Sequence, residues 1–140
     1  MKNNTLDRFL EAQERDYATA LTEIQSGRKR SHWIWYIFPQ LKGLGYSPNS
    51  EYYGLAGINE ATEYLNHSEL GLRLIQISTV LLDIKTDDPT AVMGYPDDLK
   101  LKSSMTLFAA VPGADLVFEK NLQKFFGGSK DEKTLKLLGR

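Results

Sequence analysis

Hydrophobic residues recur along this chain at steps of three and four positions, which is the period of an amphipathic α-helix. The first apolar stripe runs from Leu6 to Ile24, with charged residues on the opposite face. We expect Thr5 to cap this helix and Gly27 to end it. At residues 69–84, apolar side chains surround almost the whole helix. Because such a helix belongs in the interior, residues 69–84 are the expected centre of the fold.

One polar residue interrupts the first stripe. Gln13 lies four positions from both Phe9 and Tyr17, so it would share a helix face with these two rings. We favour a partly exposed amide at the edge of the stripe. The alternative is a buried amide that holds a loop or a ligand.

Residues that can cap a helix precede most of the remaining apolar runs. The expected capping residues are Ser31, Ser50, Asn59, Ser68, Asp88 and Ser129, and Pro96 begins a further helix with two aspartates in its first turn. There is no internal repeat and no long linker. The pattern predicts an all-α fold, a single compact domain over residues 1–140 with about seven or eight helices around a central buried helix.

Residues 31–50 break this regular pattern. Four aromatic residues fall within six positions, and a polar loop rich in glycine follows them. We expect a short helix over 32–38, with a buried strand as the alternative. If the segment is helical, Trp33 and Tyr36 share one side and Trp35 faces elsewhere, so at least one tryptophan belongs to the core. A stiff aromatic segment followed by a polar loop is a candidate wall for a ligand site.

Composition narrows the possible functions. No cysteine is present, which excludes disulfides, thiolate nucleophiles and cysteine-bound metals. With only two histidines and no metal-binding motif, we expect no metal and no cofactor. The formal net charge of −1 argues against broad nucleic-acid binding. Since no apolar run is long enough to span a membrane and no signal-peptide core is visible, we expect a cytoplasmic protein without a membrane partner.

The candidate catalytic residues are His32, Lys100 and Ser104. His32 could act as a general acid or base, although a structural histidine is the more common case. Lys100 and Ser104 lie four positions apart on one expected helix face, where a desolvated lysine can activate a hydroxyl. Their order is the reverse of the S-x-x-K hydrolase motif, and we prefer close helix packing through small residues. His67, the other histidine, is expected to be an exposed loop residue.

A second group of residues could bind a ligand without reacting with it. The candidates are two stacking rings, Trp33 and Tyr36, and four hydrogen-bonding side chains, Gln40, Ser47, Ser50 and Ser103. The loop before Ser50 leads into the start of an expected helix, where free backbone N–H groups can bind an anion. The spacing of its glycines, however, matches neither a Walker loop nor a dinucleotide-binding motif. A tight surface loop explains the same residues.

Five segments match one known family as a set. They are RFLEAQ, HWIWYIFPQLKGLGYSPNSEYYG, EATEYLNHSELGLRL, KLKSSMTLF and FFGGSKDEKTLKLL. These segments resemble the bacterial family of domains of unknown function numbered 1810, and the resemblance covers nearly the whole chain. It implies a small, mainly helical domain and no particular activity. Members sometimes carry a calpastatin-like label, which has no physical support here because protease-inhibitory repeats are disordered and this chain is built to pack.

Our leading functional hypothesis is a small-ligand pocket. We expect its walls to be residues 32–40 and the helix face 100–106, with the loop 43–50 as its rim. Aromatic rings, hydroxyls and a lysine suit a nucleotide-like or other anionic, planar molecule, which the protein would bind or process. In the enzyme version, a nucleotide hydrolase, His32 is the acid or base and Lys100 binds the anion. The alternative is a protein-interaction module in which the segment 32–40 grips a partner that the sequence does not identify.

Overall fold

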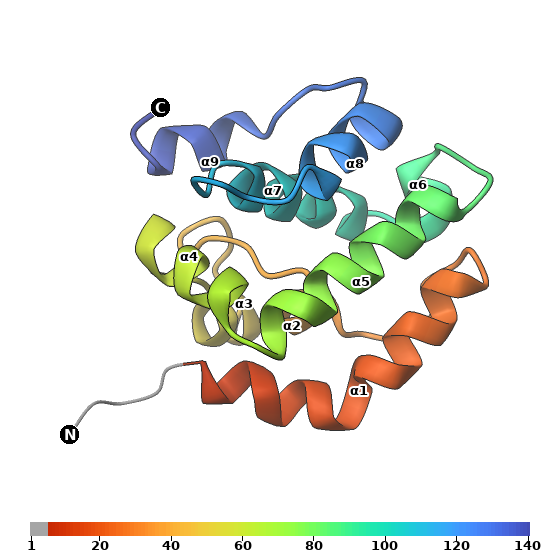
Figure 1. The fold of residues 1–140 in the computed structure, drawn as a ribbon, viewed down its shortest axis with the longest axis horizontal. Coiled ribbons are helices and arrows are strands. Elements are labelled where there is room, and N and C mark those ends of the chain that lie inside the picture. The colour runs from red at the N-terminus through yellow and green to blue at the C-terminus, as the bar shows by residue number, and fades with distance from the viewer. Residues whose placement is uncertain (1–5) are drawn as a thin grey trace.

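A computed structural model describes residues 6–140, which form a single all-α domain (Figure 1). In chain order the helices are α1 (Asp7–Gln25), α2 (Ile34–Ile37), α3 (Pro48–Tyr53), α4 (Ile58–Asn66), α5 (Leu70–Asp83), α6 (Pro89–Met93), α7 (Asp97–Ala109), α8 (Val117–Phe126) and α9 (Glu132–Leu137). The all-α prediction is confirmed, with nine helices among the described residues in place of the seven or eight expected. Thr5, the expected cap of α1, lies outside the described residues.

The centre of the fold is α7, which packs against α2, α4, α6, α8 and α9. Its buried residues are Asp98, Leu101, Ser103, Ser104, Met105, Thr106, Leu107 and Phe108. The hydroxyls of Ser103 and Thr106 donate to backbone oxygens one turn earlier, at 3.1 and 2.8 Å. Because these two hydroxyls find partners within their own helix, Ser103 and Thr106 can be buried in α7.

The prediction that residues 69–84 form the central helix is wrong. The helix in that segment, α5, packs against α1, α4 and α8 and covers one side of the domain (Figure 1). Its inner face buries Leu70, Leu74, Ile77 and Leu81, whereas Leu72 is 69% exposed. An apolar circumference did not mean complete burial, because single exposed leucines are common on soluble proteins.

A chain of aromatic contacts joins four of the helices. Phe9 of α1 meets Tyr64 of α4 edge to face, with 5.1 Å between the ring centres. Tyr64 lies 5.5 Å from Phe108 of α7, and Phe108 lies 5.7 Å from Phe118 of α8. All four side chains are fully buried, and burial of each phenylalanine contributes about 1.5–3 kcal/mol. These contacts form the rigid body on which α2 and the loop after it are placed.

Gln13 belongs to this core, contrary to our preferred interpretation of a partly exposed amide. The residue is 3% exposed. Its Nε2 donates to the backbone oxygen of Tyr36 at 2.8 Å and to the hydroxyl of Tyr64 at 2.9 Å. Its Oε1 accepts a hydrogen bond of 3.3 Å from Arg73. The amide is therefore buried, as in the alternative, but it ties α1 to α2, α4 and α5 instead of holding a loop or a ligand.

Most helix caps differ from those expected. Side chains cap the helix starts at Ser47 on α3, His67 on α5, Asp88 on α6 and Asp131 on α9. Asp88 is the one predicted correctly, and the expected caps Ser31, Ser50, Asn59, Ser68 and Ser129 do not form. A capping residue needs extended backbone just outside the helix, and the path of the chain decides which neighbouring candidate meets that condition. The ring of His67 thus has a structural role instead of being free in a loop.

Candidate functional site

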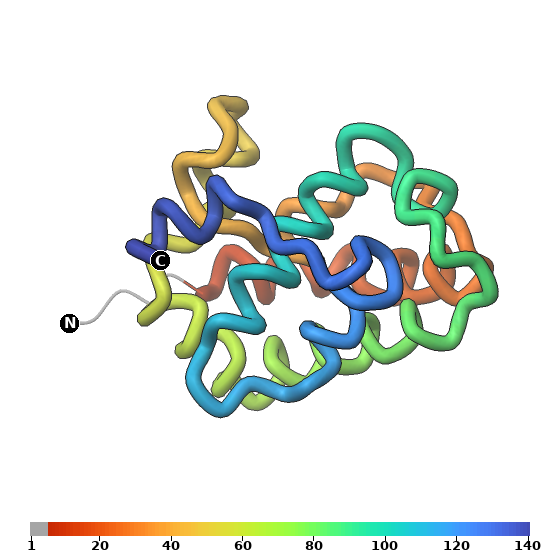
Figure 2. Tube along the Cα trace, turned by 90° about the horizontal axis from the view of Figure 1, so that it is seen from above, coloured from red at the N-terminus to blue at the C-terminus, as the bar shows by residue number. Residues whose placement is uncertain are grey.

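A cavity of about 450 Å³ lies where the loop after α2 meets the beginnings of α7 and α9. Figure 2 shows the segment between α2 and α4, in gold, projecting on one side of the molecule near the dark blue α9. The apolar and aromatic lining residues are Trp35, Leu44, Tyr46, Pro96 and Leu99, and Gly45 lies among them. The polar and charged lining residues are Gln40, Ser47, Ser50, Lys100, Ser103, Asp131 and Lys133.

Backbone contacts hold the loop in place beside the cavity. The N–H of Lys42 donates to the oxygen of Leu55 at 2.8 Å, and the N–H of Leu55 donates to the oxygen of Gln40 at 2.9 Å. Gly54 allows this approach, because a Cβ atom there would lie 2.6 Å from the Cα of Lys42. The loop then turns into α3 through Ser47, whose hydroxyl accepts from the N–H of Ser50 at 3.1 Å.

The charged groups of the cavity leave a net positive site. Lys100 Nζ lies 3.5 Å from one oxygen of Asp97, while the other oxygen of Asp97 pairs at 2.7 Å with Lys29. Lys133 is exposed and has no ion pair with any of the described residues. The carboxylate of Asp131 accepts from the N–H and hydroxyl of Thr134, so its negative charge is engaged in capping α9. Two lysines therefore line the cavity together with one carboxylate, that of Asp131, which leaves the lining with one net positive charge.

Two polar side chains at the cavity lack partners. Trp35 is half-buried, and its Nε1–H is enclosed without an acceptor in the part of the chain that the structure describes. Gln40 is 7% exposed, and its side-chain amide bonds to none of residues 6–140. An enclosed N–H without an acceptor, such as that of Trp35, costs about 1–3 kcal/mol, whereas the polar atoms of the Gln40 amide are not fully enclosed. Among the described residues, buried atoms of Ser78, Ser104 and Asn121 also lack a partner, so what distinguishes Trp35 and Gln40 is that they line the cavity.

The structure brings together five of the residues singled out in the sequence. Gln40, Ser47, Ser50, Lys100 and Ser103 all line the cavity. The expected rim, 43–50, and one expected wall, the beginning of the 100–106 helix face, therefore meet. The hydroxyl of Ser47 donates to that of Ser50 at 3.0 Å, and Ser103 donates within its own helix. Their oxygens retain lone pairs that can accept a hydrogen bond from a ligand.

Four other candidates lie outside the cavity lining. Trp33 is 1% exposed in the core, and Tyr36 packs toward α1, where its hydroxyl donates to Asp16. Burial and this hydrogen bond raise the pKa of Tyr36 above its usual value of 10.0. His32 is exposed on the surface, and Ser104 is completely buried inside α7. The lysine–serine pair thus presents only its lysine to the cavity.

Trp33 is held in the core by Glu23. One carboxylate oxygen accepts from the indole N–H of Trp33 at 2.9 Å and from the N–H groups of Arg30 and Ser31 at 2.8 and 3.0 Å. The other oxygen accepts from the hydroxyl of Ser31 at 2.6 Å. Burial raises the pKa of Glu23, but these hydrogen bonds outweigh burial and lower the pKa from 4.5 to about 2. Ser31, which we expected to cap the helix over 32–38, binds Glu23 through its N–H and its hydroxyl instead.

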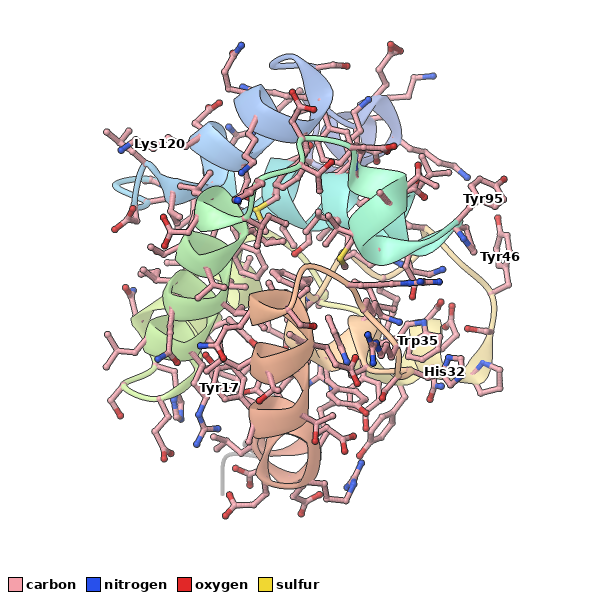
Figure 3. The ribbon with its side chains drawn as sticks, turned by 90° about the vertical axis from the view of Figure 1, so that its right-hand side faces the viewer. Tyr17, His32, Trp35, Tyr46, Tyr95 and Lys120 are labelled. Atoms are coloured by element: carbon pink, nitrogen blue, oxygen red, sulfur yellow. The ribbon has the colours of Figure 1, made fainter. Side chains whose placement is uncertain are left out.

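Sequence reasoning missed several cavity residues. Figure 3 shows Trp35, Tyr46 and Tyr95 on one side of the molecule, and Tyr17 and Lys120 on the other. Tyr46 is 87% exposed at the cavity, and Tyr95 precedes the lining residue Pro96. Trp35 lies within the expected wall 32–40, and the helical segment turns it away from the buried pair Trp33 and Tyr36. Lys133 and Asp131 carried no local signal, since their role depends on how α9 packs.

The described residues show neither a membrane-spanning helix nor a metal-binding cluster. Within residues 6–140 no helix is both long and apolar enough to cross a bilayer. Over the same residues, no group of three or more His, Asp or Glu side chains is arranged to hold a metal ion.

The fold and the cavity define a small helical domain with a cationic, aromatic-lined site. This chain belongs to the family described as "Protein of unknown function (DUF1810)", whose model matches residues 3–138. It is similar to the conserved hypothetical protein Rv1873 from Mycobacterium tuberculosis, whose crystal structure gives a TM-score of 0.94 at 43% sequence identity, with 96% of each chain covered. No curated protein matches this chain. The family resemblance is confirmed.

Proposed function

We propose that this protein binds a small, anionic molecule with a planar ring in the cavity between the 40–50 loop and α7. The lysines Lys100 and Lys133 would hold the anion, and the exposed part of Trp35 would contact the ring. A cavity of about 450 Å³ suits a ligand of the size of a nucleoside monophosphate.

The observation that carries this proposal is the charge arrangement around Lys100. Asp97 is shared between two lysines, and its shorter contact is to Lys29, at 2.7 Å against 3.5 Å for Lys100. An anionic ligand would give Lys100 a closer counterion than it has now. Lys133 adds a second positive charge from α9. Hydrogen bonds between a charged donor and a charged acceptor are the strongest that proteins make with small ligands.

Binding is better supported than catalysis. The hydrolase version requires an acid or base near the ligand, and His32 does not line the cavity. It also requires an accessible nucleophile, whereas Ser104 is 0% exposed. The lining offers recognition groups, and Lys100 is the catalytic candidate among them. We therefore restrict the proposal to binding.

The test is a titration of wild-type protein with phosphate monoesters, in which calorimetry measures the affinity and thermal unfolding measures the change in melting temperature. Phenyl phosphate and the four nucleoside 5′-monophosphates serve as probes, because each joins a ring to an anion. Binding to the native state raises the melting temperature. Replacement of Lys100 by Ala is expected to weaken the affinity roughly tenfold, as for the loss of one charged hydrogen bond. Lys120→Ala, on the opposite side in Figure 3, is the matched control and is expected to bind normally.

The protein-interaction alternative receives less support from burial. Within 32–40, only His32 is exposed, and Trp35 is half-buried. The rest of that segment is inside the core and cannot grip a partner without unfolding. If no phosphate monoester binds the wild-type protein, the ligand proposal is wrong and the exposed tyrosines near the cavity become the next surface to study.

A further inference from the structure

Gln40 is a cavity residue whose side-chain amide has no structural role among the described residues. It is 7% exposed and lines the cavity. Its backbone oxygen is engaged with the N–H of Leu55 at 2.9 Å, so the main chain at Gln40 is fixed. Its side-chain amide, in contrast, has no partner among the described residues. Gln13, the other buried glutamine, uses both ends of its amide in hydrogen bonds.

An amide presents one acceptor and two donors side by side. The group that satisfies it best carries a donor and an acceptor on neighbouring atoms of one edge. Nucleobases have this arrangement, and glutamine pairs with such edges through two parallel hydrogen bonds. A plain aromatic ring has no such edge and would leave the amide unpaired inside the complex. Recognition sites of this kind reject analogues that lack the polar edge, because the unpaired group remains costly.

The surrounding residues suit the rest of such a molecule. Trp35 and Tyr46 line the same cavity as Gln40 and offer faces on which a base can stack. Lys100 and Lys133 lie in the lining as well and can hold a phosphate attached to the sugar. The hydroxyls of Ser47 and Ser103 line the same cavity as further hydrogen-bonding groups.

We infer that Gln40 is the specificity-determining residue of the cavity, and that it selects a nucleobase-bearing anion, a nucleoside monophosphate, by pairing with the polar edge of the base. This inference rests on the proposed function, because it assumes that an anion binds in this cavity. It goes beyond that proposal in naming the class of ligand and the residue that chooses it.

The experiment compares affinities for the four nucleoside 5′-monophosphates with the affinity for phenyl phosphate, by calorimetry on the full chain. At least one nucleotide is expected to bind the wild-type protein about tenfold or more tightly than phenyl phosphate, which corresponds to two neutral hydrogen bonds. Gln40→Met keeps the length of the side chain and removes the amide. In this variant the ratio of the two affinities is expected to fall toward one.

The outcomes separate this inference from the proposed function. If phenyl phosphate binds the wild-type protein as tightly as every nucleotide, the inference is overturned and the proposed function stands. If neither kind of probe binds, the proposed function fails and the inference fails with it. Persistence of the preference in Gln40→Met would also overturn the inference. The comparison on wild-type protein decides the matter even if the variant does not fold.

Discussion

The indole N–H of Trp33 donates a hydrogen bond of 2.9 Å to the carboxylate of Glu23, ten residues earlier in the chain. This contact explains why the two tryptophans of the aromatic segment have different roles. Trp33 can be buried because its polar atom has a partner at the end of α1. Trp35, two residues on, has no such partner and lies half-buried at the cavity.

The first prediction concerns the pH dependence that Glu23 introduces. Because the folded-state pKa of Glu23 is lowered from 4.5 to about 2, its contribution to stability is complete above pH 4.5 and is lost as the pH falls toward 2. Glu23→Gln is expected to lower the free energy of unfolding by about 1–3 kcal/mol at pH 7, since a charged acceptor of four hydrogen bonds is replaced. Urea unfolding of the variant and of the wild-type protein, at pH 7 and at pH 3, measures this difference in the free energy of unfolding at each pH.

The difference between the Glu23→Gln variant and the wild-type protein is expected to shrink as the pH falls from 4.5. Glu63→Gln, at an exposed position on α4, is the matched control and should change stability little at either pH. A difference that stays constant down to pH 2 would contradict the assigned role of the carboxylate.

The second prediction separates the two tryptophans by stability. Trp33→Ala removes a side chain that is 1% exposed and is expected to cost about 3–5 kcal/mol, as for other large-to-small changes in a core. Trp35→Ala is expected to cost less, because this side chain already faces the cavity on one side. Thermal unfolding of both variants, with circular dichroism of the folded state, provides the measurement. Equal destabilisation by the two substitutions would mean that Trp35 is a core residue.

The third prediction concerns the buried amide of Gln13. Gln13→Leu leaves the backbone oxygen of Tyr36 and the hydroxyl of Tyr64 without their shared donor. Each group that loses its partner inside the core costs about 1–3 kcal/mol, so a clear loss of stability is expected in urea unfolding. Gln25→Ala, at the exposed end of the same helix, is the control. If Gln13→Leu is as stable as the wild-type protein, the amide does not hold α2 in place.

The fourth prediction concerns Gly54, which supports the loop at the cavity. A Cβ atom at Gly54 would lie 2.6 Å from the Cα of Lys42 and 2.7 Å from the oxygen of Ser50, so Gly54→Ala requires backbone movement. We expect this variant to unfold at a lower temperature and to bind phosphate monoesters more weakly. At Gly57 a Cβ atom would meet nothing within 4 Å, and Gly57→Ala should keep both properties. Normal binding by a destabilised Gly54→Ala would show that the backbone hydrogen bonds between Leu55 and residues 40 and 42 do not shape the site.

The sequence predicted the helical class because its apolar residues keep a period that a helix requires. It did not predict which helix lies in the centre. The serines and threonine of α7 look too polar for the interior, but Ser103 and Thr106 are buried because each hydroxyl bonds a carbonyl one turn earlier. Leu72 shows the opposite case, an apolar residue that tertiary packing leaves 69% exposed. Burial depends on neighbours that local periodicity does not contain.

The candidate site was predictable only in part, because local sequence shows residue types but not which distant segments meet. Gln40, Ser47, Ser50 and Ser103 were singled out as polar residues near a stiff segment, and the fold places them around one cavity. The two stacking candidates, Trp33 and Tyr36, proved to lie outside it, because Glu23 and Asp16 supply partners that turn these rings inward. Lys133 comes from α9, far along the chain, and no local pattern could assign it to the cavity.

The central claim is that an anion with a planar ring binds beside Trp35. The chain has two tryptophans, so ¹⁵N-labelled protein gives two indole N–H signals, and Trp33→Phe assigns them. On addition of guanosine 5′-monophosphate and of phenyl phosphate in turn, the signal of Trp35 is predicted to shift with at least one probe, while that of Trp33 stays in place. If both indole signals are unmoved at saturating concentrations of both probes, or if the signal of Trp33 alone moves, the account is contradicted.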